Sequence, residues 1–382
     1  MRRQQREVKH IARLVSDLYE VAGMYRQQDS LMLSLTAPDA DPNRVTMLED
    51  RLRTAGYEFS LSAAGDTVTL TVVTHRRLSV PRLNLILFVA TLFSVYVVPV
   101  FLSQLEVAAV TLSRLAEQGQ TIGKMDVLQL SLQKTLTALA HGAGLEFTAA
   151  LLSILLVHEM GHFLVSRHHG IVASWPYFIP APSIIGTFGA VIKMKSPFWS
   201  RNELVQVGAA GPIAGWLVAV LWLVYGLTRS SLLPVNAFPP GQMLFSLEGD
   251  SLLIKMLVPM LVGNPVSGYA YQLSEAAFAG WVGLLVTALN LMPVSQLDGG
   301  HILYGAIGAR QRRVAWLFVA ILLVLGLYWR GWWLYAALGM FLGVGHPPTM
   351  NDSRPLSPLA KTLVWVSVVI LLLSFIPVPF SM

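Results

Sequence analysis

The chain has 382 residues, of which 54% are hydrophobic and only 13% are charged, against about 25% charged residues in a soluble domain. It has no cysteine, which excludes disulfides and cysteine-ligated metals, so a transition metal has to be held by His, Asp or Glu. The net charge of +6 does not indicate nucleic-acid binding in this setting, because Lys and Arg collect in the cytoplasmic loops of membrane proteins.

Residues 1–80 are predicted to form a small soluble α+β domain with the element order α-β-α-β-β. Helical spacing and two-residue alternation of apolar side chains define its elements. They are a helix over Arg6–Gln27, a strand over Ser30–Thr36, a helix around Val45–Leu52, and a hairpin of Tyr57–Ala63 with Thr67–Thr74. We find no catalytic constellation in this domain, so a folded cytosolic appendage is the simpler interpretation and a regulatory or substrate-filtering role is the alternative.

Residues 81–382 are predicted to form the transmembrane domain, because apolar stretches long enough to cross the hydrocarbon core recur along them. The expected spans are Leu83–Leu105, Ala143–Val165, Leu204–Leu227, Ala276–Met292, Val314–Tyr328, Trp332–Val344 and Leu363–Phe380. We expect an exposed loop with a helical piece over 106–140, and a long connection over 229–275. The fold class predicted is an all-α polytopic membrane protein of about seven transmembrane helices with a small N-terminal α+β domain.

Basic residues set the expected orientation. Arg76, Arg77 and Arg82 precede the first span and predict a cytosolic N-terminus. No cleavable signal peptide is evident, because the basic N-terminus leads into a polar amphipathic segment. We therefore expect a multi-pass protein of the bacterial inner membrane.

The most informative motif is His158-Glu-Met-Gly-His162, an H-E-x-x-H sequence inside an apolar span. Residues four apart lie on the same face of a helix, so the two imidazoles can hold one metal ion while Glu159 faces a water molecule. Metal-binding groups are costly in lipid and usually mark function. The motif predicts one Zn²⁺ per chain with Glu159 as the general base, although these ligand types also accept Co²⁺ or Mn²⁺.

A catalytic zinc normally takes a third protein ligand, and Asp298 is the candidate. It follows a span expected to end on the same side as the histidine pair, after a helix break at Pro293. A turn residue ahead of Gly299 is the plainer interpretation, and the residues alone leave both open. Asn290 is a candidate for binding the developing oxyanion or positioning the substrate, and a plain interhelical hydrogen bond is the alternative. His301 is expected to lie behind the ligands or in solvent and not to bind the metal, and His346 is expected to be peripheral.

With these motifs in place, the chain resembles the site-2 protease family of intramembrane zinc metalloproteases over residues 83–382. The resemblance rests on His158–His162, on Leu297–Gly300 with Asn290 and Pro293 ahead of it, and on Gly208–Gly215 at the start of the third span. Pro176–Pro182 and Gly186–Ile192 resemble the cyanobacterial and plastid subgroup that is related to the plant EGY proteins. The resemblance implies zinc ligation by His158, His162 and Asp298, Glu159 as the catalytic base, and transmembrane proteins as substrates in regulated intramembrane proteolysis.

Two further segments gain a role in this setting. The small residues Gly211 and Gly215 allow close helix packing against the metal-bearing helix. Gly186–Lys193 has strand character, and we expect a hairpin whose edge pairs with an unwound substrate segment. No PDZ-like insert is found in the long connection, so the N-terminal domain is a candidate for its role.

Two other functions compete with the protease. Intramembrane His and Asp also line ion pathways, so a metal transporter is the first alternative, although it has no need of Glu159 between the histidines. A catalytically inactive membrane scaffold is the second. The sequence predicts a lipid bilayer and transmembrane substrates as partners, and leaves the oligomeric state open.

Overall fold

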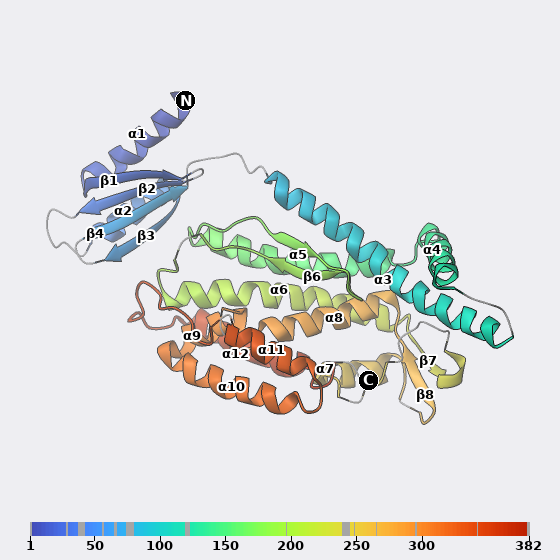
Figure 1. The fold of residues 1–382 in the computed structure, drawn as a ribbon. Helices are drawn as coiled ribbons and strands as arrows, with labels where there is room; N and C mark the ends of the chain where they lie inside the picture. The colour runs from blue at the N-terminus through green and yellow to red at the C-terminus, as the bar shows by residue number, and fades with distance from the viewer. Residues whose placement is uncertain are drawn as a thin grey trace.

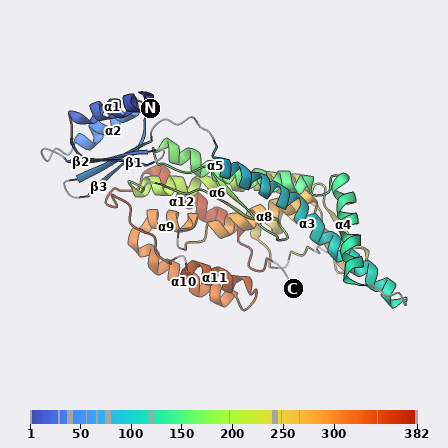
Figure 2. The same ribbon diagram turned by 45° about the horizontal axis from the view of Figure 1, so that its top comes forward.

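The computed structural model describes residues 2–379 apart from 28–29, 37–42, 56, 65–66, 74–79, 119–122, 196, 239–244, 248, 265, 295 and 342. A small mixed domain precedes a helical bundle along the chain, and the two are seen side by side in Figures 1 and 2. The helices after the N-terminal domain are α3 (Arg82–Glu117), α4 (Lys124–Ala140), α5 (Leu145–His168), α6 (Arg201–Leu227), α7 (Leu252–Leu261), α8 (Glu275–Asn290), α9 (Asp298–Ile307), α10 (Gln311–Leu325), α11 (Gly331–Phe341) and α12 (Pro358–Ser374).

The N-terminal part is an α+β unit with its own apolar core. Its elements are α1 (Arg2–Ser16), β1 (Glu20–Gln27), β2 (Ser30–Thr36), α2 (Arg44–Thr54), β3 (Glu58–Ala64) and β4 (Thr67–Val73). The four strands form an antiparallel sheet in the order β1-β2-β4-β3. Side chains of both helices close the core, among them Ile11 and Leu48, which are fully buried.

The predicted helix over Arg6–Gln27 is wrong in its second half. The helix ends at Ser16, and Glu20–Gln27 is strand β1, so the order is α-β-β-α-β-β. Helical spacing continues to Ala22, but pairing with β2 satisfies the backbone of this stretch and overrides the local pattern.

Among the residues that the structure describes, three helices, α3, α5 and α6, are long and apolar enough to cross a membrane. The shorter apolar helices are α7, α8 and α12. The 16 residues of α8 span about 24 Å, less than the roughly 30 Å of a hydrocarbon core. The predicted count of seven transmembrane helices is therefore not confirmed. The prediction of a mostly helical protein with helices able to span a membrane is confirmed.

The segment 106–140 differs from the expected exposed loop. Helix α3 continues unbroken through Pro99 to Glu117, and α4 follows as a second helix beside it. A proline is tolerated inside a membrane helix, and the apolar spacing beyond it keeps Ala108 fully buried. The helical piece of the prediction is found, but the described part of this segment is mostly helix, because the apolar spacing continues between the scattered charges.

Short strands occur where the sequence is rich in proline and aromatic residues. Strand β5 (Tyr177–Pro180) pairs with β6 (Thr187–Val191), which matches the expected hairpin. A second two-stranded antiparallel sheet, β7 (Ser231–Pro234) with β8 (Tyr269–Gln272), lies in the long connection and was not predicted. Four-residue strands carry too little periodicity to be recognised without their partners.

Helices α5, α6 and α8 lie side by side and share one apolar core (Figure 1). Near the start of α8, a Cβ built at Gly226 of α6 would lie 2.0 Å from the backbone nitrogen of Ala277. The same end of the bundle is tied by charge, because Glu275 accepts hydrogen bonds from the first amides of α5 and Arg229 pairs with Glu146. A carboxylate at a helix N-terminus also compensates the helix dipole.

Candidate metal centre

Helix α5 presents the H-E-x-x-H motif to the interior of the bundle. His158, Glu159 and His162 are 4%, 6% and 5% exposed, in a helix whose other buried side chains are mostly apolar. One helical turn separates the two imidazoles, so both lie on the same face. The sequence spacing alone is sufficient to place them together.

Glycines of α6 allow the close approach of this helix to α5. A Cβ built at Gly211 would lie 2.1 Å from Nε2 of His162, and a Cβ built at Gly215 would lie 2.9 Å from Cβ of His158. In the other direction, a Cβ built at Gly161 would lie 2.6 Å from the carbonyl oxygen of Ala210. The G-x-x-x-G segment therefore packs directly against the two histidines, as the sequence predicted.

Asp298 enters the site from the turn between α8 and α9. The chain leaves α8 after Asn290, turns through Pro293, and begins α9 at Asp298 itself. A Cβ built at Gly299 would lie 1.9 Å from the carbonyl oxygen of Leu291, so only glycine permits this close return. The sequence predicted the break at Pro293, but not helix α9.

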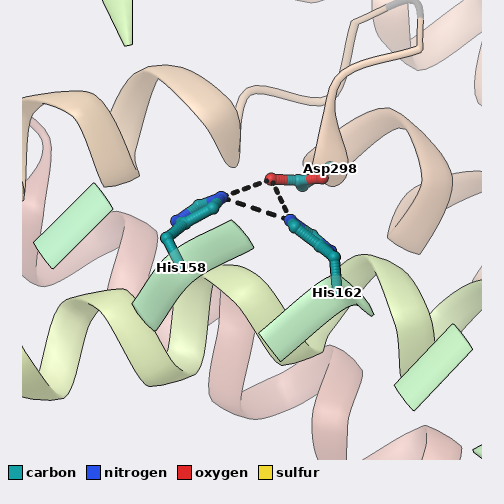
Figure 3. Close-up of side chains that lie close together, drawn as sticks. All are labelled: His158, His162 and Asp298. Carbon is teal, nitrogen blue, oxygen red and sulfur yellow. Dashed lines mark hydrogen bonds and ion pairs between the residues drawn. The ribbon is translucent and has the colours of Figure 1, made fainter. Parts of the chain in front are cut away.

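The three side chains converge within one small cluster (Figure 3). Nε2 of His158 and Nε2 of His162 are 3.2 Å apart, and Oδ2 of Asp298 lies 3.3 Å from each of them. A tetrahedral zinc with bonds of about 2.0–2.1 Å requires its ligand atoms to lie roughly 3.3–3.4 Å apart. Two imidazoles and one carboxylate at these separations fit a zinc ion that keeps one position open.

A backbone carbonyl orients His162. Its Nδ1 lies 2.8 Å from the carbonyl oxygen of Val207, which fixes the proton on Nδ1 and leaves Nε2 free to bind a metal. The sequence did not reveal this partner, because a carbonyl group carries no residue signature. Asn290 lies at the same site, with its Nδ2 3.4 Å from Nε2 of His158. Its position permits either of the roles expected for it.

Glu159 faces the hairpin. The backbone N–H of Ile192, just after β6, lies close enough to its carboxylate to favour the charged form. Lys193 directs its carbonyl and N–H towards Ser174 on the β5 side, so the alternating backbone of Ile192 faces the opposite way. The outer edge of this strand therefore passes beside Glu159.

The other histidines lie outside the cluster. Nδ1 of His301 lies 2.6 Å from Nε2 of His346, so His346 is an immediate neighbour of α9 and not peripheral as expected. Nε2 of His169 lies 3.1 Å from the side-chain oxygen of Gln206 beyond the end of α5. The metal-ligand group found among the described residues consists of His158, His162 and Asp298.

A comparison with family models supports this assignment. Residues 146–327, which include α5, the hairpin, α6 and the Asp298 turn, match the model of peptidase family M50. This region is therefore similar to M50 peptidases. The resemblance to site-2 proteases drawn from the sequence is thus confirmed.

Curated relatives of this region carry the name zinc metalloprotease. The chain is 32% identical over 241 residues to a probable chloroplastic zinc metalloprotease EGY1 of Arabidopsis thaliana, covering 62% of this chain and 43% of that protein. It is 28% identical over 242 residues to a probable chloroplastic EGY2 of Oryza sativa subsp. indica, covering 60% and 42%. The chain thus spans less than half the length of these relatives, whose names place them in chloroplasts. The bacterial inner membrane stays a prediction for this chain.

Proposed function

We propose that the chain is a zinc endopeptidase that hydrolyses peptide bonds of membrane proteins within or near their transmembrane segments. The observation that carries this proposal is the cluster of His158, His162 and Asp298 at tetrahedral separations, next to Glu159 and between apolar helices. Residues of this kind are expensive inside a bilayer and are kept for function. The M50 match and the names of the relatives agree with this chemistry.

The chemistry divides between the metal and the chain. Bound zinc would polarise the scissile carbonyl and activate a water molecule for attack. The Glu159 carboxylate accepts a proton from that water as the water oxygen adds to the carbonyl carbon. It then passes this proton to the amine nitrogen as the C–N bond breaks. The amide of Asn290 is placed to donate a hydrogen bond to the oxygen on which negative charge develops.

Replacing the base tests the proposal. In a liposome assay with a transmembrane substrate, we expect Glu159→Gln to bind zinc as the wild type does and to cleave about 10²–10⁴-fold more slowly. The matched control is Glu146→Gln on the same helix, which removes only the ion pair with Arg229 at the far end. Unchanged cleavage by Glu159→Gln would overturn the assigned base. Zinc flux without cleavage by the wild type would favour the transporter.

We also propose that the substrate binds as an added strand on the outer edge of β6. A protease has to hold its substrate extended, and strand addition supplies the main-chain hydrogen bonds that do so. The hairpin is two-stranded, and its β6 side runs past Glu159 at Ile192. By alternation from Ile192, the backbone of Ala190 also faces outwards.

Proline at this outward position tests strand addition. Ala190→Pro removes one N–H from the open edge, and we expect cleavage to fall about tenfold, since a lost hydrogen bond costs roughly 1–2 kcal/mol. Ala190→Val keeps the N–H and should cleave like the wild type. Zinc content measured in both variants reports on the metal centre. Equal cleavage by the two variants would contradict strand addition.

The orientation is part of the same proposal. The N-terminal domain and the site lie towards the same end of the bundle, because Trp199 packs on the core of that domain and a Cβ at Gly170 would meet Phe59. Basic residues gather at this end, among them Arg167 and Arg201. We assign it to the cytosol, with residues 1–80 as a cytosolic domain and 81–382 as the transmembrane protease domain.

A further inference from the structure

The outer edge of β5 is poor in hydrogen-bond donors. The segment Pro176–Pro182 has proline at 176, 180 and 182, and each proline removes a backbone N–H. Such a strand cannot pair normally on that side, and it presents carbonyl groups without the donors that usually alternate with them. The carbonyls at its two ends therefore need donors from elsewhere in the molecule.

Helix α3 supplies those donors from side chains. Nδ2 of Asn84 donates to the carbonyl oxygens of Trp175 and Pro176 at 3.0 and 2.8 Å. Oγ of Ser94 donates to the carbonyl oxygen of Ala181 at 3.0 Å. Both side chains are buried, although α3 is otherwise the most exposed of the long apolar helices.

The spacing of the two donors matches the length of the strand. Ten residues on a helix advance about 15 Å, and five residues of strand, from Pro176 to Ala181, advance about 16–17 Å. Between them, the rings of Phe88 and Phe178 meet edge to face with centroids 5.0 Å apart. One face of α3 thus follows β5 from end to end.

Beyond the strand, a glycine permits close contact with the helix. A Cβ built at Gly186 would lie 2.4 Å from Cα of Val95, and Gly186 has a φ of +74°. The turn that leads into β6 is therefore pressed against the same face of α3. The helix contacts the hairpin at both ends of β5 and at its turn.

We propose that α3 is a rigid support, called the splint below, that holds the β5–β6 hairpin in place. Asn84 with its amide and Ser94 with its hydroxyl are its positioning residues. They occupy the donor-poor edge of β5, so the edge of β6 beside Glu159 is the one left open for a substrate strand. This inference rests on the proposed strand addition and names the residues that hold the receiving strand in place.

Hydrogen exchange of the full-length protein in lipid nanodiscs tests the splint. We expect Asn84→Leu and Ser94→Ala each to speed exchange of the amides from Tyr177 to Ile192 at least fivefold, while exchange in α2 stays as in the wild type. Ser94→Thr keeps the hydroxyl and should restore slow exchange. Thr91→Val is the matched control on the same face, because the Thr91 hydroxyl is buried and makes no hydrogen bond.

Cleavage kinetics separate positioning from general support. For Ser94→Ala we expect the apparent KM to rise at least fivefold and kcat to change less than twofold, with Ser94→Thr near the wild type. Unchanged hairpin exchange in both Asn84→Leu and Ser94→Ala would overturn the splint. So would faster exchange in α2 to the same extent as in the hairpin, since the loss would then be global. If the wild type cleaves no substrate, the proposed function fails while the exchange result still decides the splint.

Discussion

Gly211 and Gly215 of α6 matter to the metal centre as directly as its ligands do. Each lies so close to an imidazole of α5 that a methyl group would overlap the ring or its Cβ. Interiors tolerate such overlap only by moving side chains or backbone, at a cost of about 1–3 kcal/mol. At this position the movement would displace a metal ligand, so the loss should appear in zinc affinity before it appears in stability.

We expect Gly211→Ala to bind zinc at least tenfold more weakly than the wild type, a loss of the size seen when a group that orients a ligand is removed. Competition with a chelator, followed by measurement of bound zinc, gives the affinity. Gly345→Ala is the control, because the nearest atom to its new Cβ is 3.6 Å away. Wild-type affinity in Gly211→Ala would show that α6 can shift without disturbing His162.

Single residues also matter on α3, where two polar side-chain atoms are buried. Oδ1 of Asn84 and Oγ1 of Thr91 are buried without a hydrogen-bond partner. An unsatisfied buried group of this kind costs about 1–3 kcal/mol. The Asn84 amide group recovers part of that cost through the two hydrogen bonds of its Nδ2.

Among the elements, the segment 349–352 ties separate helices together near the metal centre. Two of its backbone N–H groups donate hydrogen bonds to the chain just ahead of α6. The N–H of Met350 donates to the carbonyl oxygen of Phe198 at 3.1 Å, and that of Asn351 donates to the carbonyl oxygen of Trp199 at 2.8 Å. Its Asp352 accepts a hydrogen bond from Tyr304 of α9. Helix α9 carries Asp298 at its first residue, so this segment helps to hold the third proposed ligand in place.

Asp352 gives this tie a pH dependence. Burial favours the neutral form, but hydrogen bonds donated by Thr349 and Tyr304 outweigh it and hold the pKa of Asp352 below its ordinary value of 3.8. A lowered pKa stabilises the folded state above 3.8, and this contribution is lost as the pH falls through the lowered value. The tie is therefore intact at neutral pH and weakens only in acid.

Asp352→Asn should lower the melting temperature of the detergent-solubilised protein by roughly 1–3 °C at neutral pH. Melting curves recorded from pH 8 down to pH 3 should show a constant difference from the wild type above about pH 5. The difference should shrink below pH 4, where the wild type loses the same charge. A difference that widens on acidification would contradict this account.

The predictability of the elements follows their length and their dependence on partners. The ends of the long apolar helices α3, α5 and α6 were predicted to within a few residues, except for the C-terminal end of α3. Their apolar stretches are long enough to be recognised without a partner. Strand β1 and the two-stranded sheet of β7 and β8 were missed, because each is defined by its pairing partner. Helix α9 was missed because it begins directly at Asp298, where Gly299 and Gly300 read as a turn.

For the molecule as a whole, the sequence predicted the membrane protein, the family and the convergence of Asp298 on a motif 136 residues earlier in the chain. Local spacing alone placed His158 with His162. To predict that Asp298 lies on the same side of the membrane as the histidines, the order of the spans along the chain was also needed. The partners of these groups, such as Val207 and Ile192, contribute backbone atoms, which any residue type supplies, so no sequence pattern could identify them.

Helices α5, α6 and α8 are linked by charged side chains at one end of the bundle, so a small rotation about that end produces a larger displacement at the other. Glu275, Glu146 and Arg229 fasten α5, α6 and α8 at the end remote from the N-terminal domain. Helix α5 has 24 residues and is about 36 Å long. A rotation of ~8° about the fastened end therefore moves the other end by roughly 5 Å, close to the 4.7–4.9 Å between neighbouring strands. A tilt of this size would shift the free end by the width of one strand, and it would carry His158 and His162 together because both lie on α5.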